Sequence, residues 1–197
     1  MVGLKFTRTV TLNYTVNMIG LASSILLFYI ALSNNAWWMV RGGTGDEYTF
    51  IAEVSPFNIV VKVLDRPVTV PILPYLCLAA RLSILLAATT TFIGSLLASK
   101  PWSKPMMSIS GLKLPIIFIG ILFASLSLAN LFIDVNIPIT GESTLKYVIP
   151  YHGSTIATET PVITTLTEEY WIALAAGVLS ALAKIAHNKA LLQRNNT

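Results

Sequence analysis

The longest apolar stretch of the sequence runs from Ile72 to Ala98 and contains one charged residue, Arg81. Pro71 stands directly before it, and the polar segment Ser-Lys-Pro at 99–101 follows it. A helix of about 20 apolar residues is long enough to cross the hydrocarbon core of a bilayer. We therefore predict a membrane-spanning helix over 72–98, around which the rest of the chain is arranged.

Three further apolar segments have a similar character, at 14–33, 114–133 and 170–186. Of the 197 residues, 54% are hydrophobic and only 11% are charged, whereas about a quarter of the residues in soluble domains are charged. We predict a single polytopic membrane domain over 1–197, a membrane all-α fold in which four transmembrane helices form a bundle. The spans are joined by loops at 34–71, 99–113 and 134–169.

The charged residues are divided between the loops by sign. The N-terminus, the loop 99–113 and the C-terminus contain only basic residues, whereas the loops 34–71 and 134–169 contain all nine acidic ones. Basic residues are enriched in the cytoplasmic loops of membrane proteins. We therefore predict a multi-pass, tetraspan protein of the plasma (cell) membrane, with both termini in the cytoplasm and the two long loops outside.

Both of the long loops contain strand patterns. Apolar and polar residues alternate over 47–54 and 57–63, which is typical of half-buried strands. Residues 135–139 alternate in the same way in the second loop, and 146–149 is a further short strand pattern. We predict that strands from both loops pair into one small extracellular β-sheet over the outer ends of the helices.

Arg81 lies inside a predicted span, so the division of basic and acidic residues between the loops does not explain it. It lies roughly 13 Å from the outer end of the predicted helix, where an isolated charge is costly in lipid. One interpretation is a contact with an anion or substrate in a polar cavity, or with an acidic residue of another chain. The other is that its guanidinium reaches the outer sheet and ties the sheet to the bundle.

Small residues recur at four-residue spacing in every predicted span. Such positions let helix backbones approach closely in lipid. They favour packing within the four-helix bundle or self-association through the fourth span. These helix-packing residues are Gly20, Ser24, Gly94, Ala98, Gly120, Ala124, Ala173, Gly177 and Ala181.

Tryptophans stand near the ends of the predicted spans. Amphipathic rings prefer the interface between hydrocarbon and water, and we therefore interpret all four of them as interfacial anchors. They are Trp37, Trp38, Trp102 and Trp171.

Catalytic chemistry has little support in the sequence. There is one cysteine, Cys77, and the two histidines, His152 and His187, are far apart along the chain, so the sequence contains no Cys/His metal-binding pattern. We predict no catalytic residue, no metal and no cofactor, and no enzyme activity of the chain by itself. The segregation of charge by loop also argues against nucleic acid as a partner.

The combination of four spans, a first outer loop that opens near Trp37 and Trp38, and strands at 47–54 and 57–63 resembles the claudin and peripheral-myelin-protein class of tetraspan proteins. The resemblance is claudin-like in architecture only. The chain lacks the paired cysteines and the Gly-Leu-Trp signature of that class, and its second outer loop is as long as the first. The resemblance therefore implies a shape and no shared function.

We expect an integral membrane protein with a non-catalytic accessory, structural or adhesion-type role, acting through its outer sheet and its helix contacts in the membrane. Its partners would be the lipid bilayer and either another membrane protein or a second copy of itself. The alternative is a transport or channel component that uses Arg81 in a polar intramembrane cavity. A third expectation is a non-catalytic subunit of a membrane enzyme complex.

Overall fold

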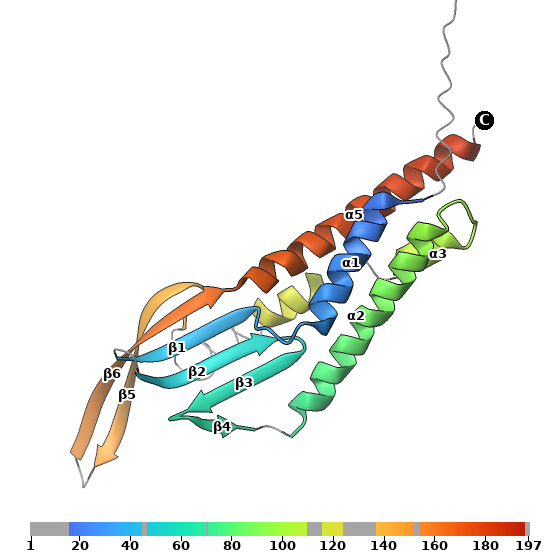
Figure 1. Ribbon diagram of the computed structural model, residues 1–197. Coiled ribbons are helices and arrows are strands. Elements are labelled where there is room, and N and C mark those ends of the chain that lie inside the picture. Colours follow the sequence, from blue (N-terminus) through green and yellow to red (C-terminus); the bar gives the residue numbers. More distant parts are fainter. Residues whose placement is uncertain are drawn as a thin grey trace, which may run out of the picture.

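A six-stranded sheet stands at one end of a group of helices (Figure 1). The computed structural model describes residues 16–44, 47–69, 71–109, 116–123, 137–151 and 154–195. The strand order is β4-β3-β2-β1-β6-β5, and every neighbouring pair is antiparallel. The strands are β1 (Trp38–Thr44), β2 (Glu47–Ser55), β3 (Asn58–Val63), β4 (Arg66–Val68), β5 (Gly141–Tyr151) and β6 (Ser154–Leu166).

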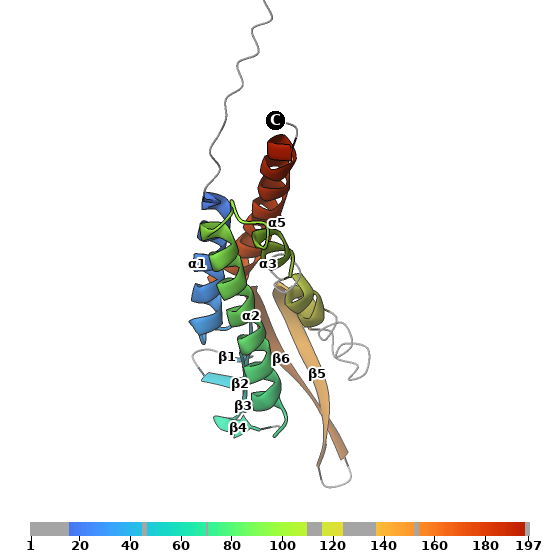
Figure 2. The same ribbon diagram turned by 90° about the vertical axis from the view of Figure 1, so that its right-hand side faces the viewer.

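Three helices extend away from the sheet. The helix α1 (Met18–Leu32) packs against both α2 (Leu73–Leu96) and α5 (Glu168–Asn195). The short helix α3 (Ser103–Ile109) packs against α2 at the end that is far from the sheet, and 116–123 forms a further helical segment. Figure 2 shows that the beginning of α2 lies beside β3 and β4, so this helix reaches past the sheet end of α1.

The helices begin where their sequences supply suitable ends. The side chain of Asn17 accepts a hydrogen bond of 3.1 Å from the backbone N–H of Gly20, and this caps the first turn of α1. At α2, Pro74 occupies the first turn, where a missing N–H costs no helical hydrogen bond. The two acidic residues Glu168 and Glu169 lie in the first turn of α5, where carboxylates are favoured by the helix dipole.

Two distant segments of the chain meet in the sheet through β1 and β6. Residues Trp38 to Gly42 of β1 pair with Val162 to Leu166 of β6. The remainder of β6 pairs with β5 alone among the described strands, so the β5–β6 hairpin projects beyond the four-stranded part of the sheet (Figure 1). The sheet is therefore compact near the helices and extended at its far end.

The core has two parts. One lies between the helices and includes Leu27, Ile84 and Ala173, and it reaches Trp37 and Phe57 at the base of the sheet. The second part lies on one face of the sheet and consists of Trp38, Val40, Ala52, Leu122 and Val162. Because Leu122 belongs to the segment 116–123, that segment packs on the sheet as well as on the helices.

The strands predicted at 47–54 and 57–63 are confirmed as β2 and β3. The second strand-forming region is much larger than expected, because β5 and β6 together cover 141–151 and 154–166. The residues 155–167 are rich in Thr, a β-branched residue that favours strands. The alternation of apolar and polar residues by itself did not predict β6.

The predicted fold class is wrong. The described residues form a mixed α/β fold with an extensive antiparallel sheet, and not an all-α bundle of four transmembrane helices with a small sheet. The first predicted span, 14–33, contains a helix of only 15 residues, which is about 22 Å long. The third, 114–133, is helical over 116–123, and its residues 124–133 lie outside the described part of the chain.

The predicted tetraspan protein of the plasma membrane, with both termini in the cytoplasm, is likewise wrong. Among the described residues, two helices are long and apolar enough to cross a membrane, Leu73–Leu96 and Glu168–Lys189. These two correspond to the spans predicted at 72–98 and 170–186. The shorter apolar helix Met18–Leu32 falls below the length of about 20 residues that a crossing requires.

Candidate functional site

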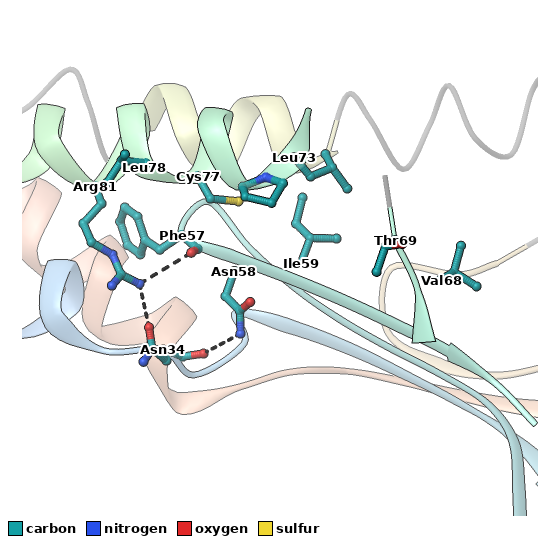
Figure 3. A pocket seen from close by; sticks show the side chains of 11 residues that line it. Asn34, Phe57, Asn58, Ile59, Val68, Thr69, Leu73, Cys77, Leu78 and Arg81 are labelled. Atoms are coloured by element: carbon teal, nitrogen blue, oxygen red, sulfur yellow. Dashed lines mark hydrogen bonds between the residues drawn. The ribbon is translucent and has the colours of Figure 1, made fainter. Parts of the chain in front are cut away.

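Arg81 lies in the third turn of α2 and points toward the junction of α1 with the sheet (Figure 3). Its Nη2 donates a hydrogen bond of 2.6 Å to Oδ1 of Asn34 and one of 3.4 Å to the carbonyl oxygen of Phe57. The guanidinium carbon also lies 6.0 Å from the centre of the Phe57 ring. Since Asn34 follows the end of α1 by two residues, Arg81 stands at the boundary between the helices and the sheet.

The same side chain borders a half-open cavity of about 410 Å³ between the beginning of α2 and the strands β3 and β4. Its lining combines amide and hydroxyl groups with apolar side chains, and none of the described residues that line it is acidic. The lining residues are Asn34, Phe57, Asn58, Ile59, Val68, Thr69, Leu73, Pro74, Cys77, Leu78 and Arg81.

Both interpretations of Arg81 thus find a counterpart in the structure. Its bond to the Phe57 carbonyl ties α2 to the start of β3, as a tether would. It also lines a cavity, but this cavity lies between a helix and two strands and not between helices. Within the described part of the chain, no carboxylate lies within ion-pair distance of its guanidinium.

Cys77 lies one turn before Arg81 and contributes its side chain to the same cavity (Figure 3). It is a buried free thiol. A single thiol offers one metal ligand at most, and no group of three or more potential metal ligands occurs among the described residues.

The predicted small residues lie mostly between helices of the same chain. Gly20 is packed so closely that an added Cβ would lie 2.0 Å from the Ser95 side-chain oxygen of α2. Ser24, Gly94, Ala98, Ala173 and Gly177 are buried, and Ala181 is half-buried. Gly120 is exposed, with no atom within 4 Å of such a Cβ, and Ala124 lies outside the described residues.

Side-chain hydroxyls and one amide complete the contact between α1 and α5. Ser23 lies 2.5 Å from the hydroxyl of Ser180 and 3.2 Å from the carbonyl of Ala176. The Asn17 amide donates to the carbonyl of Ala183 at 2.9 Å. Such interhelical hydrogen bonds and small side chains are the means by which helices associate in lipid.

The four tryptophans divide into two pairs. Trp37 and Trp38 are buried, with 1% and 3% of their surface exposed, and the Trp38 indole donates to the carbonyl of Ile139 at 2.8 Å. They lie in the protein core and not on a surface that lipid headgroups could reach. Trp102 and Trp171 are exposed, so only these two have the placement that an interfacial anchor needs.

Sequence reasoning missed the pair formed by Ser103 and His187. Ser103 Oγ lies 3.1 Å from Nε2 of His187, and both side chains are almost completely buried. Ser103 Oγ also lies within hydrogen-bond distance of the carbonyls of Ala98 and Lys100. The contacts link α3 to α5, and their burial leaves no access for a substrate. The two residues are 84 positions apart in the sequence, so no local sequence pattern predicts the pair.

No known protein-family model matches this chain, and no curated protein is significantly similar to it. The chemistry and geometry of its own residues therefore indicate its function. The Arg81 cavity and the outward surface of the helices are the two features that bear on it.

Proposed function

We propose that the protein is embedded in a membrane through its helices and acts as a non-catalytic accessory or adhesion-type protein through its sheet. The observation that carries the proposal is the exposure of its two long apolar helices, α2 and α5. Only 28% of the most apolar window of α2 is buried, and 39% of that of α5. A core helix of a soluble protein would be buried over most of such a stretch, because its apolar surface must be removed from water.

The exposed apolar side chains extend over all three long helices. Monomeric soluble proteins rarely expose connected apolar patches larger than a few hundred Å², whereas lipid is a suitable environment for such a surface. The most exposed large apolar side chains are Met18, Ile25, Tyr29 and Leu32 on α1, Tyr75, Leu76, Leu78, Leu82 and Leu86 on α2, and Trp171, Val178, Leu182 and Ile185 on α5.

The polar groups of the helices complement this arrangement, because several of them are turned inward. Ser23, Ser24, Ser180 and Asn17 are buried and form hydrogen bonds within the chain. Polar side chains that bond to one another between helices, together with large apolar side chains that face outward, are typical of helices in lipid. This organisation supports residence in lipid.

The β5–β6 hairpin is the part of the sheet best placed to contact another protein. Among the described strands, β1 pairs with β6 only over Val162 to Leu166, and the hairpin extends past the last of these pairs. Strand edges and projecting hairpins present backbone N–H and C=O groups that a partner can pair with. We favour this role over transport, because the cavity at Arg81 is bounded by α2 and strands and not by two helices.

Residence in lipid can be tested on the unaltered protein. The purified chain would be placed in vesicles whose phospholipids have a photoreactive diazirine in the acyl chain, and the labelled residues would be mapped by mass spectrometry. We expect labels at exposed positions of α2 and α5 such as Leu82, Leu86 and Leu182, and none on β2 or β3. A water-soluble diazirine should label the complementary set. Labelling of Leu82 and Leu86 from water would contradict membrane embedding.

The accessory role requires a second measurement, in which proteins that co-purify in mild detergent are compared between two variants. In the first, residues 147–158 are replaced by Asn-Gly, so that a two-residue turn joins the facing residues Lys146 and Glu159. In the control, the β3–β4 turn residues Leu64 and Asp65 become Asn-Gly. We expect the shortened hairpin to lose its partner and the control to retain it. A partner that both variants retain would contradict this role of the hairpin.

A further inference from the structure

The guanidinium of Arg81 has no anionic partner among the described residues of the cavity. Both hydrogen bonds of the guanidinium come from Nη2 and end on neutral oxygens, those of Asn34 and Phe57. Its Nε and Nη1 donors have no hydrogen-bond partner among the described residues. An arginine retains its charge at any physiological pH and binds carboxylate or phosphate oxygens through two parallel donors. The free donors therefore suit an anion in the cavity.

Other groups around the cavity favour the same kind of ligand. Asn58 and Thr69 add an amide and a hydroxyl to the lining. The positive end of α2 also borders it, since this helix begins at Leu73, has no side-chain cap and has no acidic residue in its first turn. The partial positive charge of a helix N-terminus favours anions nearby. Among the residues that the structure describes around the cavity, no acidic side chain opposes an anion.

An apolar stripe continues from the cavity along α2. Leu78 lines the cavity, and Leu82 and Leu86 follow at spacings of four residues, so all three lie on one face of the helix. They are 54%, 57% and 63% exposed. A ligand with an anionic head and a long apolar chain would thus find a charged contact at Arg81 and an apolar track of about 8 Å along the helix from there to Leu86.

We propose that this cavity binds the phosphate headgroup of an anionic phospholipid, with Arg81 as its charged contact and the leucine stripe as the track for one acyl chain. The site rests on the proposed residence of the helices in lipid. Arg81 lies level with the end of α1, and a charge within the apolar part of α2 is costly in lipid unless an anion reaches it. The volume of about 410 Å³ lies within the usual range for small-molecule sites.

The test is native mass spectrometry of the protein released from nanodiscs that contain phosphatidylcholine with or without phosphatidylglycerol. We expect the unaltered protein to retain one phosphatidylglycerol, and Arg81→Gln to lower that retention on the order of tenfold. Arg81→Lys should restore part of it, because a point charge remains without the planar fork. Arg66→Gln is the matched control, since Arg66 lies on β4 outside the cavity. Equal loss in the Arg66 variant would overturn the site.

A second variant tests whether Arg81→Gln loses the lipid only because the contact between α2 and the sheet is disturbed. Asn58→Asp is nearly isosteric and leaves Arg81 in place, but it adds a negative charge to the cavity lining. We expect the same loss of phosphatidylglycerol as in Arg81→Gln. Thermal unfolding in phosphatidylcholine alone should change only slightly, because the variant loses one exposed hydrogen bond of 3.4 Å from the Asn58 amide to the Asn34 carbonyl. Retention of the lipid by Asn58→Asp would contradict the site.

Two further measurements distinguish a lipid site from a site for free phosphate and from a failure of the membrane proposal. Inorganic phosphate is added in excess to the nanodiscs, and complete displacement of the lipid would identify a site for free phosphate and overturn the lipid assignment. Acyl-chain labelling of Leu182 is recorded in parallel. If Leu182 is labelled while phosphatidylglycerol retention is the same in all variants, the lipid site fails and the membrane proposal stands. If Leu182 is not labelled in the unaltered protein, the membrane proposal itself fails.

Discussion

Arg81 Nη2 donates to Asn34 Oδ1 over 2.6 Å and thereby joins the third turn of α2 to the segment between α1 and the sheet. Together with the bond from Arg81 to the Phe57 carbonyl, this contact fixes three parts of the chain at one point. Trp37 packs its ring edge-to-face on Phe57, with 5.7 Å between the ring centres. The orientation of the sheet relative to the helices is therefore maintained by a small group of side chains.

Removal of the Asn34 amide should weaken this junction. Asn34→Ala deletes an acceptor for a charged donor, and because the contact is exposed to solvent we expect a loss of about 1 kcal/mol in the free energy of unfolding. Asn34→Asp retains the acceptor and should be at least as stable as the unaltered protein. Thermal unfolding in detergent micelles measures both. A stability of Asn34→Ala equal to that of the unaltered protein would show that the bond contributes nothing.

The close approach of α1 and α2 at Gly20 gives a second expectation. Gly20→Leu would force its side chain into Ser95 and Met107 and should destabilise the protein by about 1–3 kcal/mol through overpacking. Gly120→Leu makes the same chemical change at an exposed position with free space around it. Its stability should be unchanged or slightly raised, because leucine is a better helix former than glycine. Equal effects at the two sites would argue against the observed packing.

The Ser103–His187 contact can be measured by a double-mutant cycle. We expect Ser103→Ala and His187→Ala each to destabilise the protein, because each leaves a buried polar group without this partner. The coupling between them should be about 1 kcal/mol. Denaturant unfolding of the two single variants and of the double variant gives this value, and strictly additive effects would indicate that the two side chains do not interact.

The β3–β4 turn contains two residues that are suboptimal for its backbone. Leu64 and Asp65 have φ angles of 50° and 58° and join the paired residues Val63 and Arg66. A two-residue turn of this kind favours Asn-Gly, because glycine has no Cβ and, among the other residues, Asn and Asp are the least strained at positive φ. We expect Leu64→Asn to raise the unfolding free energy by about 0.5–1 kcal/mol. Leu64→Ala, which retains the strain, serves as the control and should bring no gain in unfolding measurements.

The agreement between sequence and structure depends on the range of the interactions involved. The helix over Leu73–Leu96 and the strands β2 and β3 were predicted within a few residues, because each follows from a periodicity of hydrophobic residues along the chain. The length of α1 was overestimated, because hydropathy does not show where a capping residue begins the helix. The predicted span began at Tyr14, but Asn17 is the N-terminal cap, so the helix begins only at Met18.

The sequence by itself determined which segments are apolar, where charges gather and where strands alternate, since these properties depend on neighbouring residues. Only the tertiary structure decided how those segments meet. It paired β1 with β6, buried Trp37 and Trp38, and brought Ser103 to His187. It also placed Arg81, which the sequence puts roughly 13 Å into a predicted span, beside Asn34 just after the end of α1. Contacts between residues so distant in the chain depend on the packing of whole elements, which no local pattern encodes.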